Sequence, residues 1–120
     1  MILYHIAEKA CWLSQAHKGI YKPEQFGIDG FIHCSTETQI LEVANRFYKG
    51  KENLILLKID ANLVTAPIIF ENLEGGKEQF PHIYGQLNTN SVVGLIDLMT
   101  DDAGVFSFSD VDVELTLSCR

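Results

Sequence analysis

The sequence is poor in positive charge, and it contains only two arginines, Arg46 and Arg120. Its 120 residues carry nine Lys+Arg against sixteen Asp+Glu, which gives a formal net charge of −7. Proteins that bind nucleic acid or anionic membranes rely on clustered cationic contacts to phosphates. We therefore expect neither as a partner. A small phosphate-bearing ligand is still compatible, because a helix N-terminus and one or two cations can hold it.

Long apolar runs and closely spaced cysteines are also missing. No apolar run approaches the roughly 18 residues of a membrane span, and the first residues lack the basic segment of a signal peptide. Cys11, Cys34 and Cys119 are odd in number and widely spaced, as is typical of reduced thiols rather than of a disulfide framework. These absences predict a cytoplasmic protein.

What remains suits one small domain, because an apolar fraction of 47% supplies a hydrophobic core without disulfides. Helical spacing of apolar residues predicts a helix over residues 8–18 and a second helix that starts at Thr36 and ends at Gly50. Short strands are predicted at residues 2–7, 30–34, 53–59, 68–71, 80–85, 91–99 and 105–108. Because strands dominate after the two helices, we expect an α+β fold. Residues 1–108 would form the domain, and residues 109–120 an edge strand or a tail.

Three histidines lie in or beside predicted strands, at His5, His33 and His82. Alternate side chains of a strand share a face, so His33 lies with Ser35, and His82 lies with Tyr84. A histidine near a hydroxyl or a bound substrate can act as an acid, a base or a hydrogen-bond donor near neutral pH. His33, His82 and Tyr84 are therefore candidate catalytic residues.

The residues around these histidines allow two interpretations. Ser35, Thr36 and Gln39 would either hold an anion at a helix N-terminus or only cap that helix, with Thr36 and Gln39 as a capping box. Glu71 ends an apolar strand, where it would orient a histidine or a ribose hydroxyl, or simply be the first solvated residue. Pro81 removes a ladder donor, so residues 80–85 are expected at a sheet edge or loop lip rather than in a central strand.

A metal site built from the three histidines is the alternative to acid–base chemistry, because neutral imidazole is a common metal ligand. The sequence has no H-E-x-x-H, no C-x-x-C and no other tight ligand pair. His33 and Cys34 are adjacent and would face opposite ways in a strand. The spacing therefore assigns no metal ligand, and the three-histidine site stays open as an alternative.

Two strings carry a resemblance to a known family, G-F-I-H-C-S at residues 30–35 and F-P-H-I-Y-G at residues 80–85. Together with residues 4–6, Trp12, Gln39, residues 44–48 and Glu71, they resemble the DUF952 family, small bacterial proteins of unassigned function. The resemblance spans about residues 2 to 108, nearly one domain in extent. That family is similar to a compact ADP-ribosylation fold, which implies two small split sheets, about two helices and a cleft for NAD.

The resemblance also implies roles for individual residues. His5 would hold the nicotinamide-side ribose, His33 and Ser35 would contact the ribose or the pyrophosphate, and His82 with Tyr84 would line the reactive end. Glu71 completes the catalytic candidates, and Thr36, Gln39 and Arg46 complete the ligand-binding set. NAD is then the possible cofactor, and transfer or hydrolysis of its ADP-ribosyl part is the expected reaction.

A non-catalytic module that binds a small metabolite or a protein is the alternative to this enzyme. The transferase pattern needs a carboxylate late in the chain, and Glu71 lies early for that role. The fold analogy therefore transfers more directly than the activity.

Overall fold

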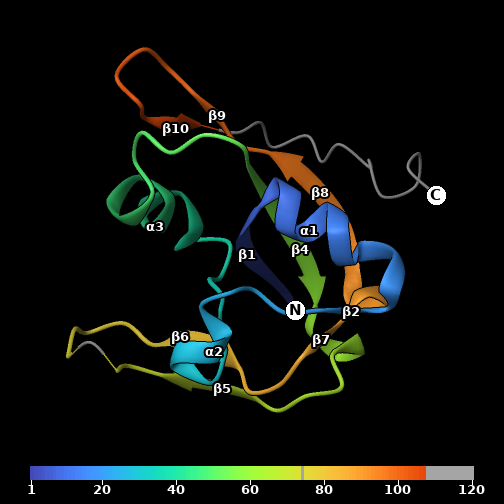
Figure 1. Ribbon diagram of the computed structural model, residues 1–120. Coiled ribbons are helices and arrows are strands. Elements are labelled where there is room, and N and C mark those ends of the chain that lie inside the picture. Colours follow the sequence, from blue (N-terminus) through green and yellow to red (C-terminus); the bar gives the residue numbers. More distant parts are fainter. Residues whose placement is uncertain (74, 108–120) are drawn as a thin grey trace.

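Two three-stranded antiparallel sheets organise the computed structural model (Figure 1), which describes residues 1–73 and 75–107. The larger sheet has the order β1-β4-β8, with strands Ile2–Glu8, Leu54–Asp60 and Val92–Asp97. The smaller sheet has the order β3-β6-β5, with strands Ile32–His33, Phe80–Ile83 and Ile68–Glu71. An isolated antiparallel bridge between Tyr4 and Ser35 joins the two sheets.

Short helices and strand pairs connect these sheets, and the predicted α+β class is confirmed. The three α-helices of the described residues are α1 (Lys9–Gln15), α2 (Phe26–Asp29) and α3 (Ile40–Phe47). The 3-10 turns are η1 (Ala16–Lys18), η2 (Ala61–Leu63) and η3 (Thr89–Ser91). The two-stranded pairs join β2 (Ile20–Tyr21) to β7 (Leu87–Asn88), and β9 (Met99–Thr100) to β10 (Phe106–Ser107).

The larger sheet is buried on both faces, which explains the nearly continuous apolar run of β4. Leu3, Leu57 and Ile59 belong to a core cluster that also contains Trp12 of α1. Alternate residues such as Leu56 belong to a second cluster that packs on α3 and β10. His5 has the same parity as Leu3, so its side chain enters the first cluster. No helix of residues 1–73 and 75–107 has the length and apolarity to cross a bilayer.

The prediction of an edge position for residues 80–85 is wrong, because β6 is the central strand of its sheet. The carbonyl of Pro81 accepts from the amide of Cys34, so the imide nitrogen of Pro81 faces β3 as well. That strand ends at His33, and the missing donor therefore falls where the ladder stops. Proline is tolerated here because one neighbouring strand is short.

Helix α3 begins at Ile40 rather than directly after Thr36. Residues 37–39 form turns, although the amide of Ile40 already donates to the carbonyl of Thr36 at 3.1 Å. Half of the predicted capping box is present, since the Thr36 amide donates to Gln39 Oε1 at 3.0 Å. The Thr36 hydroxyl bonds to Thr38 instead of capping the helix.

The predicted strand at residues 105–108 is present up to Ser107, where β10 pairs with β9 in a hairpin. The side-chain amide of Asn45 in α3 forms two hydrogen bonds with the backbone of β10. Its Oδ1 accepts from the Phe106 amide at 2.6 Å, and its Nδ2 donates to the Phe106 carbonyl at 3.2 Å. Residue 108 and the predicted strand or tail at 109–120 lie outside the described residues, so that prediction stays a prediction.

Gly85 marks a close approach between the end of β6 and the segment before β5. A Cβ added at Gly85 would lie 2.8 Å from the Cβ of Ala66. We expect Gly85→Ala to lower the free energy of unfolding by about 1–3 kcal/mol through this overlap. Urea denaturation would measure the change.

The matched control is Gly27→Ala, because a Cβ at Gly27 meets nothing within 4 Å. Gly27 lies in α2, where alanine is favoured over glycine, so this control should be neutral or slightly stabilising. Equal loss of stability in the two variants would contradict the contact at Ala66.

Candidate functional site

A carboxylate–histidine pair forms where α2 turns into β3. Gly30 follows α2 with a φ of +78°, a left-handed conformation that glycine adopts readily, and the chain reverses there. His33 Nε2 then lies 2.7 Å from Asp29 Oδ2. Because a carboxylate only accepts, the imidazole donates its Nε2 proton. This hydrogen bond lowers the pKa of Asp29 below its usual value.

A second pair forms across β5 and β6. His82 Nδ1 donates to Glu71 Oε1 at 2.9 Å, and the Tyr84 hydroxyl donates to the same oxygen. His82 and Tyr84 share the face that strand alternation predicts. The hydrogen bonds from Tyr84 and then from His82 lower the pKa of Glu71. The bond to Glu71 raises the pKa of Tyr84.

The other nitrogen of His82 is open to the solvent space of the site. His82 is only 5% exposed, and its ring stacks on Phe31 at a centroid distance of 4.1 Å. Among the described residues every fully buried polar side-chain atom has a hydrogen-bond partner, whereas none of these residues bonds to His82 Nε2. Nε2 must therefore retain contact with solvent, while Glu71 holds the opposite side of the ring.

His5 is a neutral, internally bonded histidine. Its Nδ1 donates to the carbonyl of His33 at 2.6 Å, and its Nε2 accepts from the Tyr21 hydroxyl at 2.9 Å. Burial lowers the pKa of His5 from 6.5 to about 4 and raises that of Tyr21. Both ring nitrogens are thus engaged by the protein itself.

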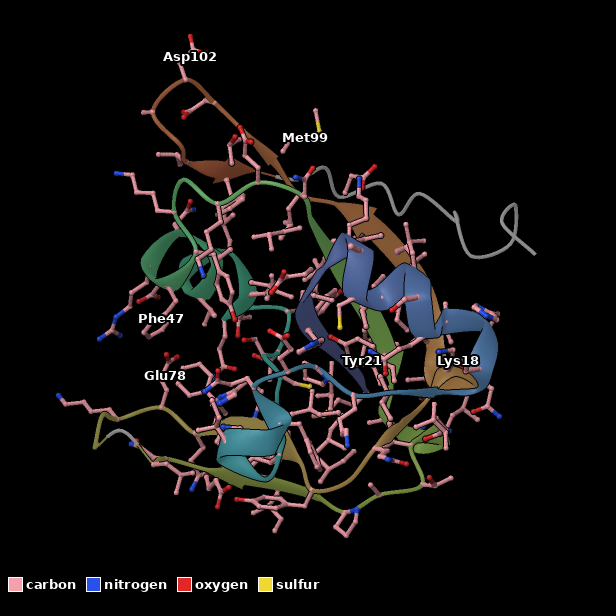
Figure 2. All side chains as sticks on the ribbon, in the orientation of Figure 1. Lys18, Tyr21, Phe47, Glu78, Met99 and Asp102 are labelled. Atoms are coloured by element: carbon pink, nitrogen blue, oxygen red, sulfur yellow. The ribbon has the colours of Figure 1, made fainter. Side chains whose placement is uncertain are left out.

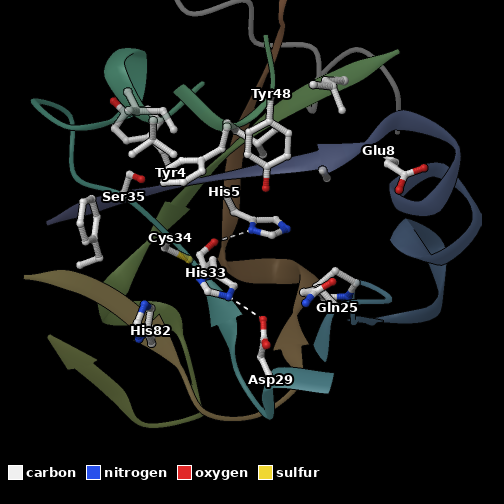
Figure 3. A pocket seen from close by; sticks show the side chains of 18 of the residues that line it. Tyr4, His5, Glu8, Gln25, Asp29, His33, Cys34, Ser35, Tyr48 and His82 are labelled. Carbon is white, nitrogen blue, oxygen red and sulfur yellow. Dashed lines mark hydrogen bonds and ion pairs between the residues drawn. The ribbon is translucent and has the colours of Figure 1, made fainter. Parts of the chain in front are cut away.

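These groups lie along one open cleft with a volume of about 1000 Å³, which falls at the upper end of small-molecule sites. Its walls come from both sheets, from α1, α3 and the segment around α2. Figure 3 shows the chain of hydrogen bonds that runs from His5 through His33 to Asp29 inside it. Five predicted site residues line the cleft: His5, His33, Ser35, Glu71 and His82.

Four predicted site residues do not line the cleft, namely Thr36, Gln39, Arg46 and Tyr84. Tyr84 is connected to the cleft through Glu71, because its hydroxyl donates a hydrogen bond to that carboxylate. Gln39 joins two chain segments, since it also donates to the carbonyl of Gln79 at 2.9 Å. Arg46 is exposed, with its guanidinium 5.1 Å from the centroid of the Phe47 ring. Thr36, Gln39 and Arg46 do not line this cleft, so their predicted role in ligand binding stays a prediction.

Sequence reasoning missed Asp29, the partner of His33, and Phe31, which packs between the rings of the site. The ring of Phe31 lies 4.6 Å from His33 and 5.2 Å from Tyr84, centroid to centroid. The available signal was the spacing of Asp29 four residues before His33, with Gly30 directly after the aspartate. It carries meaning only once the reversal at Gly30 is known.

The cysteine of the G-F-I-H-C-S string belongs to the core. Cys34 is buried in the cluster that contains Leu3 and Trp12, and burial raises the pKa of its thiol well above the usual value. No group of three or more His, Cys, Asp or Glu side chains in residues 1–73 and 75–107 has the arrangement of a metal site. The three-histidine alternative therefore has no support in the geometry.

Three solved structures are similar to this chain over most of its length. A crystal structure of protein CC0527 from Caulobacter crescentus has a TM-score of 0.80 and 31% identity, and covers 89% of this chain and 94% of that chain. Its double mutant has a TM-score of 0.79, 31% identity and the same coverage. The solution NMR structure of CC0527 has a TM-score of 0.75 and 32% identity, over 87% of this chain and 90% of that chain.

No curated protein matches the chain. The family described as "Protein of unknown function (DUF952)" matches residues 6–95, which include the end of β1, all of β4 and both carboxylate–histidine pairs. This match covers more than half of the chain and confirms the resemblance first noted in residues 30–35 and 80–85. The chain belongs to the DUF952 family.

Proposed function

We propose that this protein is an enzyme that binds NAD or a related nicotinamide ribosyl compound and transfers or hydrolyses its ribosyl part. The observation that carries the proposal is His82, which lines the cleft while Glu71 holds its Nδ1 and no described residue bonds to its Nε2. A buried imidazole oriented in this way by a carboxylate is suited to accept a proton from an attacking hydroxyl or water. The choice of substrate follows the ADP-ribosylation fold that the sequence resemblance implies.

Two further features fit the cleavage of a bond between ribose and a ring nitrogen. Such reactions pass through a transition state in which the ribose carries positive charge, and nearby carboxylates stabilise that charge. Glu71 and Asp29 both lie on the cleft wall. Glu71 acts mainly through His82, as a positioning residue, because its Oε1 is already engaged by His82 and Tyr84.

Apolar side chains on the α3 side of the cleft suit a flat heteroaromatic ring. Val43 and Phe47 of α3 line the cleft together with Leu73 and Phe80 of the β5–β6 hairpin. Figure 2 shows Phe47 on the side of α3 nearer to that hairpin. Apolar walls with a few convergent polar groups are the usual composition of small-molecule sites.

The non-catalytic alternative rested on the lack of a carboxylate for the reaction. Glu71 lies on the cleft wall and is bonded to the candidate base. The geometry therefore favours the enzyme over the binding module.

The direct test is release of nicotinamide, followed by chromatography after incubation of the purified full chain with NAD, nicotinamide mononucleotide and nicotinamide riboside in turn. We expect turnover of at least one of the three, because water can replace a missing acceptor. Ligand binding without any release would support the binding module instead. Neither release nor binding would overturn the proposed function.

A further inference from the structure

We propose that the cleft selects a cationic, phosphate-free riboside and discriminates against nucleotides that carry phosphate. The inference rests on the proposed function and names the substrate class for the same site. Nicotinamide riboside is the simplest member of this class. Its pyridinium ring carries a positive charge, and its ribose carries no phosphate.

The first argument is the charge of the cleft wall. Among residues 1–73 and 75–107, five carboxylates line it, and Lys51 is the one lysine or arginine beside them. The five are Glu8, Glu24, Asp29, Glu52 and Glu71. A phosphate in this cleft would meet like charge on several sides, and like charges at close range disfavour binding.

We call the three exposed carboxylates of the cleft, Glu8, Glu24 and Glu52, the rim carboxylates. Among residues 1–73 and 75–107, no ion pair involves Glu8, Glu24 or Glu52. Lys51, in turn, lies with its Nζ 5.4 Å from the centroid of the Tyr48 ring. The rim therefore keeps its negative field, which attracts a cation and repels an anion.

The second argument is the aromatic content of the same wall. In the described part of the chain, six aromatic side chains line the cleft: Tyr4, Tyr21, Phe31, Phe47, Tyr48 and Phe80. The faces of aromatic rings attract organic cations, and this attraction strengthens when the cation leaves water. Acidic and aromatic groups together match a positively charged heteroaromatic ring.

The third argument is that one ring nitrogen of His82 is available to a ligand. His82 lines the cleft and is 5% exposed, and its Nε2 has no hydrogen-bond partner among the described residues. Because every fully buried polar side-chain atom of the described residues has a partner, Nε2 must keep some contact with solvent. A molecule bound in the cleft could therefore take the place of this solvent and bond to Nε2.

The reaction balances with water as the second substrate. The bond between C1′ and the pyridinium nitrogen breaks, and its electron pair leaves with neutral nicotinamide. The water oxygen forms the new bond to C1′, while His82 Nε2 takes a proton from that water and passes it to solvent. A cationic riboside and water thus give ribose, nicotinamide and one proton.

Binding of the three probes to the full chain by calorimetry tests the selectivity. We expect nicotinamide riboside to bind at least about tenfold more tightly than the mononucleotide, and NAD to bind no better than the mononucleotide. The preference should shrink at high salt, because the rim carboxylates are exposed and screened. Equal or tighter binding of either phosphate-bearing probe would overturn the selectivity and leave the proposed function standing.

A double variant separates charge from shape. Glu24→Gln with Glu52→Gln keeps the side-chain size and should narrow the preference for the riboside several-fold. Glu37→Gln is the matched control, because Glu37 is exposed and does not line the cleft. If the double variant keeps the same preference for the riboside, the inference is overturned. If none of the three probes binds or reacts, the proposed function itself is overturned.

Discussion

Replacing His82 with glutamine is expected to lower the rate of nicotinamide release by about two to four powers of ten, the usual contribution of a general acid–base residue. Glutamine is similar in size and can still donate to Glu71, but it cannot accept a proton from water. The expected loss is in kcat, since the missing step is proton transfer rather than binding. Steady-state kinetics with nicotinamide riboside, the substrate expected above, would measure it.

Two measurements keep this result interpretable. His17→Gln alters an exposed histidine of η1 that does not line the cleft, and it should leave the rate unchanged. A thermal unfolding curve shows whether the His82 variant is folded, because the ring also packs on Phe31. A folded His82→Gln protein with an unaltered kcat would remove His82 from the reaction.

The stability of the protein should fall as the pH is lowered through the range set by His5. Burial lowers the pKa of His5 from 6.5 to about 4 in the folded state. Between these values the unfolded chain binds a proton that the folded chain does not, so unfolding becomes easier as the pH falls. The contribution of His5 is fully present above pH 6.5 and amounts to about 3 kcal/mol, lost progressively towards pH 4.

Urea denaturation at several pH values would show this dependence. His5→Gln removes the titration and keeps one donor and one acceptor for the His33 carbonyl and Tyr21, so its stability should change less over the same range. Asp29 and Glu71 also have lowered pKa values, but their contributions are lost only below the ordinary carboxyl values of 3.8 and 4.5. Identical pH slopes for the two proteins would contradict the buried neutral state of His5.

Strand alternation and apolar periodicity predicted much of this fold, because both depend on neighbours close in sequence. The pairing of His82 with Tyr84 on one face follows from a spacing of two residues. The wrong prediction of an edge position for residues 80–85 has a different cause. Pro81 forbids one ladder bond, but only the length of β3 decides whether that bond is needed.

The candidate site could be predicted only in part, because its pairs depend on contacts between distant segments. Glu71 and His82 are neighbours through the register of β5 with β6, which no local pattern specifies. Asp29 reaches His33 only after the reversal at Gly30. The acidic rim is the least visible feature, since Glu8, Glu24 and Glu52 come from three separate segments.

The bridge between Tyr4 and Ser35 joins the sheets through residues that also touch the cleft. Tyr4 and Ser35 exchange two backbone hydrogen bonds of 2.8 Å, and the side chain of the next residue, His5, binds the carbonyl of His33. Tyr4, His5 and Ser35 all line the cleft. A substitution at this junction would change the spacing of the sheets and the shape of the ligand site together. Glu24 and Glu52 lie outside the helices and strands and are exposed, so we expect a substitution there to change the charge of the cleft without disturbing this junction.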